Sequence, residues 1–406
     1  MIKNNVVSRN GKLKTFFKKK TNNENLPNIN YGKTLFKGNR DNVRYMNTKL
    51  LGCTIFLVLF GLAMVYSASS YSAELIYGSK YYFLTKQIVG AVAGFGALIF
   101  AYYFDYHKLE KFKWVILGAS ILLLALVFVP VLGVSNNGAR RWLNLGLFTI
   151  QPSEIAKFGF VVWCSSYLSK NYKTIKKFST LIPVLLFGGI ICLLIILEPN
   201  MSITMCVGIT MVVMLFVGGI RAKHFAYLSV PLAGAVPLLI IAEPYRFKRL
   251  IAFINPWLNP KNEGYQLIQS LYSLGSGGLF GVGLFNSRQK YLFLPFAESD
   301  FIFSIIGEEF GFVGCVIIIA IFAIFILSGI KIALNSTDRF GCFLATGITT
   351  VIASQVLINI AVVSGSIPPT GVPLPFISAG GTALVVFMAS VGVLLNIHKQ
   401  SKGKIC

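Results

Sequence analysis

The chain has 406 residues, of which 55% are hydrophobic and only 13% are charged, and its mean hydropathy is +0.70. This composition excludes a soluble globular protein. A membrane span takes about 20 apolar residues, so the chain can form about ten spans with little left for a water-soluble core. The net charge of +23 then needs an explanation, because a basic chain can bind nucleic acid or anionic lipid.

Residues 1–49 are rich in lysine, arginine and asparagine and contain only two acids, Glu24 and Asp41. We expect this segment to be a disordered basic tail. The first apolar run starts near residue 50 and is long enough to span, unlike the short run of a cleaved secretory signal. The tail is therefore expected to remain on the chain and to lie in the cytoplasm, where anionic lipid is favoured over nucleic acid as its contact.

Ten apolar runs follow the tail, and each is predicted to be a membrane-spanning helix. They cover residues 50–68, 88–104, 114–132, 155–168, 181–197, 202–219, 225–242, 301–329, 342–362 and 372–397. Residues 50–398 are thus expected to form one all-α polytopic membrane domain, followed by a short cytoplasmic C-terminus, 399–406. Most lysines and arginines between spans fall on the side of the tail, so the positive-inside rule places both termini in the cytoplasm.

Glu154 and Lys157 are charged residues at the outer end of the predicted fourth span. Their i, i+3 spacing puts them on one helix face, where they can pair, and Pro152 and Ser153 suit a helix start. Intramembrane ionisable residues suggest function by default. A purely structural ion pair between packed helices explains the same spacing. The functional and the structural interpretation therefore both remain open.

Arg140, Arg141 and Trp142 precede this span and fall on the outer side, against the general charge bias. Positive charge near a helix N-terminus at the outer membrane face suits a lipid phosphate. A turn that is basic without any ligand fits the spacing equally well.

Residues 243–299 form the longest loop between spans, an external one that joins the seventh span to the eighth. Apolar residues at i, i+3, i+4 and i+7 within 245–257 predict an amphipathic helix in the plane of the membrane interface. Its interleaved cations are Arg246, Lys248 and Arg249. We expect them to face an anionic headgroup, although ordinary anionic lipid would satisfy them too.

Asp300 enters the predicted eighth span, and Ser304 and Glu308 follow at i+4 and i+8 on one face. Such a polar stripe suggests the wall of a cavity, whereas a helix-capping aspartate at the membrane edge is the plainer alternative. The seven cysteines form no CxxC motif, and the three histidines lie on expected cytoplasmic segments. Any external chemistry must then use carboxylates as its acid and base.

Five segments, in order along the chain, resemble one family. They are GARRWLNLG with QPSEIAK, GYQLIQSL with GSGGLFGVGL, SRQK, SDFIFSIIGEEFGFVG and PPTGVPLPFISAGGTAL. These segments resemble the SEDS proteins (shape, elongation, division and sporulation), most of all the FtsW and SpoVE branch. The resemblance runs from about Leu50 to the last predicted span.

This resemblance implies a ten-span peptidoglycan glycosyltransferase that polymerises lipid II on the outer face of the bacterial cytoplasmic membrane, in division or sporulation. It implies that Asp300 is the catalytic residue and that Glu154 and Lys157 are functionally important. The implied partners are lipid II, the undecaprenyl-pyrophosphate-linked glycan, a class B penicillin-binding protein (a transpeptidase) and other division proteins. Nucleic acid is not among them.

The chemistry read from the residues agrees with this function. A carboxylate can activate an attacking sugar hydroxyl, and cations can stabilise departing phosphates. On this hypothesis Asp300 is the general base. The expected substrate-binding residues are Glu154, Lys157, Arg140, Arg141, Trp142, Arg246, Lys248, Arg249, Ser304, Glu308 and Ser378. A divalent cation, Mg²⁺ or Mn²⁺, is left open as a cofactor, and none other is expected.

The chain departs from the family motifs at four positions, which are Asn200, Asn255, Phe296 and Ala379. Two alternative functions also fit. Intramembrane charges and a wide external loop are compatible with a transporter or flippase for the same lipid. The third possibility is a scaffold that recruits the transpeptidase and has lost activity, against which the intact Asp300 motif argues.

Overall fold

The computed structural model describes residues 42–402, apart from 131, 137–138, 145, 147–148, 222, 225, 228–233 and 235–243. The described residues from Arg44 onward form one compact unit. Of the expected basic tail, 1–49, nearly all lies outside the described residues. Its last part is helical, because helix α2 begins at Asn42, so the expectation of disorder is wrong there.

Helices make up most of the described chain. They are α2 (Asn42–Tyr77), α3 (Tyr82–Tyr103), α4 (His107–Lys111), α5 (Lys113–Leu126), α6 (Pro152–Lys170), η1 (Phe178–Thr180), α7 (Ile182–Leu197), α8 (Met201–Val217), α10 (Pro244–Ile254), η2 (Pro256–Leu258), α11 (Tyr265–Ser276), α12 (Ile302–Leu334), α13 (Arg339–Val363) and α14 (Gly381–Lys402). The predicted helix start near Pro152 and the predicted helix within 245–257 are confirmed by α6 and α10.

Six helical segments within the described residues are long and apolar enough to cross a membrane, and they lie in α2, α3, η1 with α7, α12, α13 and α14. Helices α5 and α8 are shorter apolar helices. Nearly all of the expected seventh span, 225–242, lies outside the described residues. The chain is therefore a mostly helical, multi-pass membrane protein.

A small antiparallel sheet interrupts the helices, so the all-α prediction is wrong at this point. Its strands are β1 (Gly133–Asn136), β2 (Ala139–Asn144) and β3 (Thr149–Ile150), in the order β1-β2-β3. Side chains alternate between the two faces of a strand. Arg141 and Leu143 consequently share one face of β2, where Leu143 is buried, and Arg140 and Trp142 share the other.

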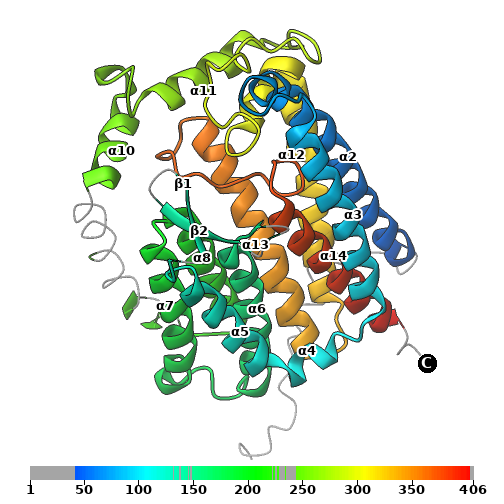
Figure 1. The fold of residues 1–406 in the computed structure, drawn as a ribbon. Helices are drawn as coiled ribbons and strands as arrows, with labels where there is room; N and C mark the ends of the chain where they lie inside the picture. The colour runs from blue at the N-terminus through cyan, green and yellow to red at the C-terminus, as the bar shows by residue number, and fades with distance from the viewer. Residues whose placement is uncertain are drawn as a thin grey trace, which may run out of the picture. The chain divides into compact units, whose positions relative to one another are not determined.

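Helices from distant parts of the chain pack side by side (Figure 1). Helix α14 packs along α3, and α13 contacts α12, α6 and α8. Helices α10 and α11 lie at one end of the helices and α4 lies at the opposite end. The segments that connect the predicted membrane helices thus lie at two opposite ends, as expected for a protein that crosses the membrane several times.

The segment 364–380, here called the central loop, is not helical. The predicted last span, 372–397, begins too early, because α14 begins at Gly381 and runs to Lys402, four residues into the expected C-terminal tail. Four prolines, at positions 368, 369, 373 and 375, remove backbone donors and exclude a regular helix. Gly371 adds a φ of +74°, a conformation that favours glycine.

Side chains from four helices hold the carbonyls of the central loop. The donors are Gln87 of α3 to Ser378 (3.0 Å), Asn359 of α13 to Val372 (2.6 Å), Arg249 of α10 to Pro369 (2.9 Å) and Ser202 of α8 to Thr370. Irregular backbone at membrane depth is tolerated only where the protein supplies such partners. The loop is thereby fixed to helices on several sides.

Gly61 of α2 provides a test of this packing. A Cβ at Gly61 would lie 2.7 Å from the Cα of Ile377 and the carbonyl oxygen of Phe376, both in the central loop. Overpacking against fixed backbone costs about 1–3 kcal/mol, so we expect G61A to lower the melting temperature of the protein in detergent micelles. The matched control is G52A in the same helix, where nothing lies within 4 Å of the added Cβ. Equal melting temperatures for the two variants would contradict the close approach.

Candidate active site

Asp300 lies in the loop directly before α12, and its side chain is partly buried. Its carbonyl oxygen accepts a hydrogen bond from Asn359 Nδ2 at 2.8 Å. A Cβ at Gly371 would lie 3.0 Å from Asp300 Oδ2, so the carboxylate packs against the glycine of the central loop. The capping alternative is wrong, because the N-cap of α12 is Phe301 and no side chain caps the helix.

Two arginines from distant elements act on this carboxylate. Arg141 of β2 donates from Nε to the carbonyl oxygen of Glu198 at 3.1 Å and from Nη2 to that of Pro199. Arg249 of α10 donates to Pro369 as described above. Burial raises the pKa of Asp300 to about 6, and the charges of Arg141 and Arg249 oppose that increase. A carboxyl group with this pKa is mostly ionised near neutral pH and can accept a proton.

Glu198 is a residue of this site that sequence reasoning missed. It follows α7 directly and is fully buried, and its carboxylate oxygens accept no hydrogen bond from the described residues. Burial raises the pKa of Glu198 to about 8, although Arg141 opposes the change. Glu198 is then mostly protonated, and so uncharged, at neutral pH. It does not neutralise the positive charge of Arg141, which therefore acts on Asp300. The position of Glu198 at the end of an apolar helix is the sequence feature that could have identified it as a site residue.

Glu298 completes what we call the arginine–carboxylate cluster: Arg141, Glu198, Arg249, Glu298 and Asp300. Burial raises the pKa of Glu298, and the negative charge of Asp300 raises it further. The carbonyl oxygen of Glu298 accepts from Ala379 N at 2.9 Å, which joins the cluster to the central loop. An ionised Asp300 can deprotonate a hydroxyl, and the two arginines that act on it can bind phosphate oxygens.

The carboxylates of the cluster do not by themselves provide a three-ligand metal site. Among the residues that the structure describes, no three His, Cys, Asp or Glu side chains come together in a way that could hold a metal ion. The expected Mg²⁺ or Mn²⁺ stays a prediction.

Glu154 and Lys157 form the predicted ion pair, with Lys157 Nζ 2.9 Å from Glu154 Oε2 and both side chains fully buried. Lys157 Nζ also donates to Gln355 Oε1 at 2.7 Å, and Gln355 Nε2 lies 3.5 Å from the carbonyl oxygen of Pro373. Buried charges need this kind of pairing. The pair thereby connects α6, through α13, to the central loop two residues beyond Gly371.

Ser378 and Ser304 make contacts within the protein itself. Ser378 Oγ donates to the carbonyl oxygen of Ser299 at 2.5 Å and accepts from Leu374 N at 2.8 Å. It therefore holds the central loop beside the residue that precedes Asp300. Ser304 Oγ donates to the carbonyl oxygen of Phe301 at 2.6 Å within the first turn of α12.

Glu308 anchors a loop, and the expected stripe of Asp300, Ser304 and Glu308 along one helix is wrong because Asp300 precedes the helix. The buried Glu308 carboxylate accepts from the hydroxyl of Ser287 at 2.5 Å and from the backbone N–H of Arg288 at 3.0 Å. A carboxylate that binds the chain's own backbone in this way fixes the loop before α12.

The remaining predicted residues are placed differently. Trp142 pairs with Val134 across the sheet, and Arg140 is exposed on the same face of β2. Lys248 lies 3.9 Å from Glu263 in a largely exposed ion pair. The side chain of Arg246 lies outside the described residues. Of the cations expected to contact phosphate, the structure brings Arg141 and Arg249 to Asp300.

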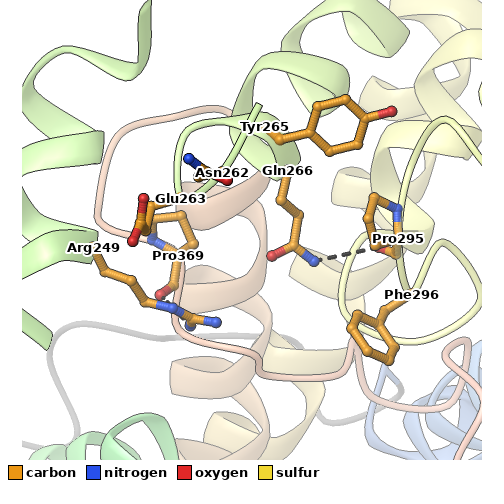
Figure 2. A pocket seen from close by; sticks show the side chains of 8 residues that line it. All are labelled: Arg249, Asn262, Glu263, Tyr265, Gln266, Pro295, Phe296 and Pro369. Carbon is orange, nitrogen blue, oxygen red and sulfur yellow. Dashed lines mark hydrogen bonds between the residues drawn. The ribbon is translucent and has the colours of Figure 1, made fainter. Parts of the chain in front are cut away.

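A cavity of about 340 Å³ opens beside Arg249 and is here called the Arg249 cavity. Its lining residues are Arg249, Asn262, Glu263, Tyr265, Gln266, Pro295, Phe296 and Pro369 (Figure 2). Gln266 lies between Arg249 and Phe296 in this view and donates to the carbonyl oxygen of Pro295 at 3.3 Å. Arg249 thus belongs both to the cavity and to the arginine–carboxylate cluster.

Known proteins resemble the whole of this membrane unit. The chain is 42% identical over 352 residues to stage V sporulation protein E of Bacillus subtilis, covering 86% of this chain and 96% of the relative. It is 37% identical over 369 residues to a probable peptidoglycan glycosyltransferase FtsW of Geobacter metallireducens, covering 91% and 98% of the two chains.

Solved structures show the same fold. One is a chain from a study of how a peptidoglycan synthase complex coordinates polymerization and crosslinking, with a TM-score of 0.71 at 27% identity. The match covers 86% of this chain and 97% of that one. Another is the rod shape determining protein RodA of Thermus thermophilus, with a TM-score of 0.65 at 26% identity, covering 86% and 96%.

A family model described as cell cycle protein, for FtsW, RodA and SpoVE, matches residues 47–403. This match leaves out only the basic N-terminal segment and the last three residues, and it includes every member of the arginine–carboxylate cluster. The chain belongs to the FtsW, RodA and SpoVE family of cell cycle proteins.

Proposed function

We propose that this protein is a peptidoglycan glycosyltransferase that polymerises lipid II on the outer face of the cytoplasmic membrane, in division or sporulation. The observation that carries the proposal is Asp300, whose carboxylate packs against Gly371 of the central loop and is stabilised by the charges of Arg141 and Arg249. The name of the Geobacter metallireducens relative supports the same activity, and that of the Bacillus subtilis relative supports a role in sporulation. The proposal includes ten spans, both termini in the cytoplasm, and the cluster on the outer side.

In the proposed reaction, a sugar hydroxyl of one lipid-linked substrate attacks the anomeric carbon of another. Asp300 takes the hydroxyl proton as the new glycosidic C–O bond forms. The bond from the anomeric carbon to the lipid pyrophosphate breaks, and the pyrophosphate leaves with the electron pair. Arg141 and Arg249 stabilise the charge that develops on the departing phosphates.

The arginines are suited to this role because they are already fixed. Arg141 is tied to the carbonyls of Glu198 and Pro199, and Arg249 to that of Pro369. Preorganised donors do not have to reorient when charge develops, which is the main source of electrostatic catalysis. A class B penicillin-binding protein is the proposed partner, and the likeness to a chain from a peptidoglycan synthase complex supports it.

The first test replaces the proposed base. Asp300→Asn keeps the size of the side chain and removes the proton acceptor, so we expect polymerisation of lipid II to fall by about 100-fold or more. Purified protein, with and without a class B penicillin-binding protein, is assayed for glycan strands by gel electrophoresis. An unchanged melting temperature of the variant shows that the fold is kept.

Full activity of the Asp300→Asn variant would refute the assigned base. Reconstituted vesicles test the function itself: movement of labelled lipid II across the bilayer by the wild type, without polymer, would show a flippase instead.

The second test uses the pH dependence of the rate at saturating lipid II. A general base acts when ionised, so the rate should rise with pH through a midpoint of about 6. The charge of Arg141 lowers the pKa of Asp300. Arg141→Gln should therefore move the midpoint to higher pH, and Arg141→Lys, which keeps the charge, should move it less.

Arg140→Gln is the matched control, since Arg140 is the exposed neighbour on the opposite face of β2. Equal shifts in the Arg140 and Arg141 variants would show that general surface charge, and not contact with Asp300, sets the midpoint.

A further inference from the structure

We propose that the Arg249 cavity is a saccharide subsite that holds one sugar unit of the glycan next to Asp300, with the ring of Phe296 as its stacking surface. This inference rests on the proposed function and names the part of the substrate that the cavity binds. The lining residues, the backbone of Phe296 and the link between the cavity and Asp300 support it.

Phe296 is held in an unusual conformation at the wall of the cavity. Its φ of +56° is in the left-handed region, which is strained for a bulky residue. Such strain persists only where the surroundings enforce it, and it is concentrated at ligand sites. The side chain is also 49% exposed. The backbone is therefore strained while much of an aromatic ring remains open to a ligand.

The other lining residues match the chemistry of a sugar. A pyranose has apolar faces made of C–H groups and a rim of hydroxyl groups. The ring of Phe296 and the C–H groups of Pro295 suit the faces, whereas the amides of Asn262 and Gln266 can bind the rim. Most small-molecule sites combine apolar walls with a few polar groups in this way.

The size of the cavity limits its occupant. Small-molecule sites measure about 300–1,000 Å³, and this cavity, at about 340 Å³, lies at the lower end of that range. It therefore suits one sugar unit and not a length of strand, which would continue away from the protein through the open side.

The central loop places the subsite beside the cluster. Arg249 lines the cavity and donates to Pro369, and two residues further on Gly371 contacts Asp300. Arg249 also stabilises the charge of Asp300. A sugar bound in the cavity would thus lie beside Pro369, two residues along the central loop from the glycine that packs against Asp300, where an acceptor or donor unit is expected.

The test removes the ring without adding strain. Glycine adopts positive φ freely, so Phe296→Gly deletes the stacking surface and keeps the backbone. The probe is a lipid-free tetrasaccharide of alternating N-acetylglucosamine and N-acetylmuramic acid, titrated by calorimetry into the purified full chain. We expect affinity to fall by about three- to tenfold and the glycan strands made from lipid II to become shorter. Phe296→Tyr keeps an aromatic ring and should therefore keep both the affinity and the strand length of the wild type.

Leu292→Gly is the matched control. Leu292 has a φ of +66° and is 52% exposed in the same loop, but it does not line the cavity. We expect this variant to bind the tetrasaccharide and to make strands as the wild type does.

Three results would overturn the subsite. The first is unchanged tetrasaccharide affinity in Phe296→Gly, and the second is an equal loss of affinity in Leu292→Gly. The third is a Phe296→Gly variant that keeps its affinity for the tetrasaccharide but binds vesicles of anionic lipid less well than the wild type. The Asp300→Asn variant separates this inference from the proposed function. It should bind the tetrasaccharide normally while failing to polymerise. Polymer formation by that variant would refute the catalytic role of Asp300 and leave the subsite standing.

Discussion

The fold of the site depends on the hydrogen bonds that hold the carbonyls of the central loop. This segment is irregular because of its prolines, yet much of it is buried among the helices, where backbone carbonyls need donors from the protein. Gln87, Ser202, Arg249 and Asn359 supply the missing donors from four different helices. Without them the loop could not remain buried, and Gly371 would not meet Asp300. The geometry of the site thus follows from the hydrogen bonds that the backbone carbonyls of the loop accept.

The charges around Asp300 favour its ionised form near neutral pH. Burial disfavours the charged form of every acid in the cluster, and it keeps Glu198 mostly protonated. At Asp300 the charges of two arginines oppose this effect of burial. Since those arginines are tied to backbone carbonyls, their positions do not depend on the substrate. The cluster is therefore prepared for a phosphate-bearing ligand before it arrives.

Much of this architecture could be predicted from the sequence. Hydrophobic runs located the helices, and the i, i+3 spacing of Glu154 and Lys157 predicted their ion pair. The small sheet was missed because its strands are short and one of them is strongly basic. The sequence also did not show which of the cations act on Asp300. The charge of Arg141 acts on Asp300, whereas Arg140 lies on the opposite face of β2, because residues alternate along a strand. That alternation matters only once a strand is known. Glu198 was missed because contacts between distant elements bury it.

The way in which the central loop is held has an evolutionary consequence. The donors of the surrounding helices bind main-chain carbonyls, which every amino acid possesses, and Ala379 donates its backbone N–H to the carbonyl oxygen of Glu298. Side chains of the loop that are neither buried in the core nor hydrogen-bonded, unlike those of Phe376, Ile377 and Ser378, can therefore change over time without loss of its shape, provided that position 371 stays glycine. This explains how the chain carries Ala379, a departure from the family motif, beside an unaltered Asp300. In such a site the helices that supply the donors should be under selective constraint together with the buried part of the loop.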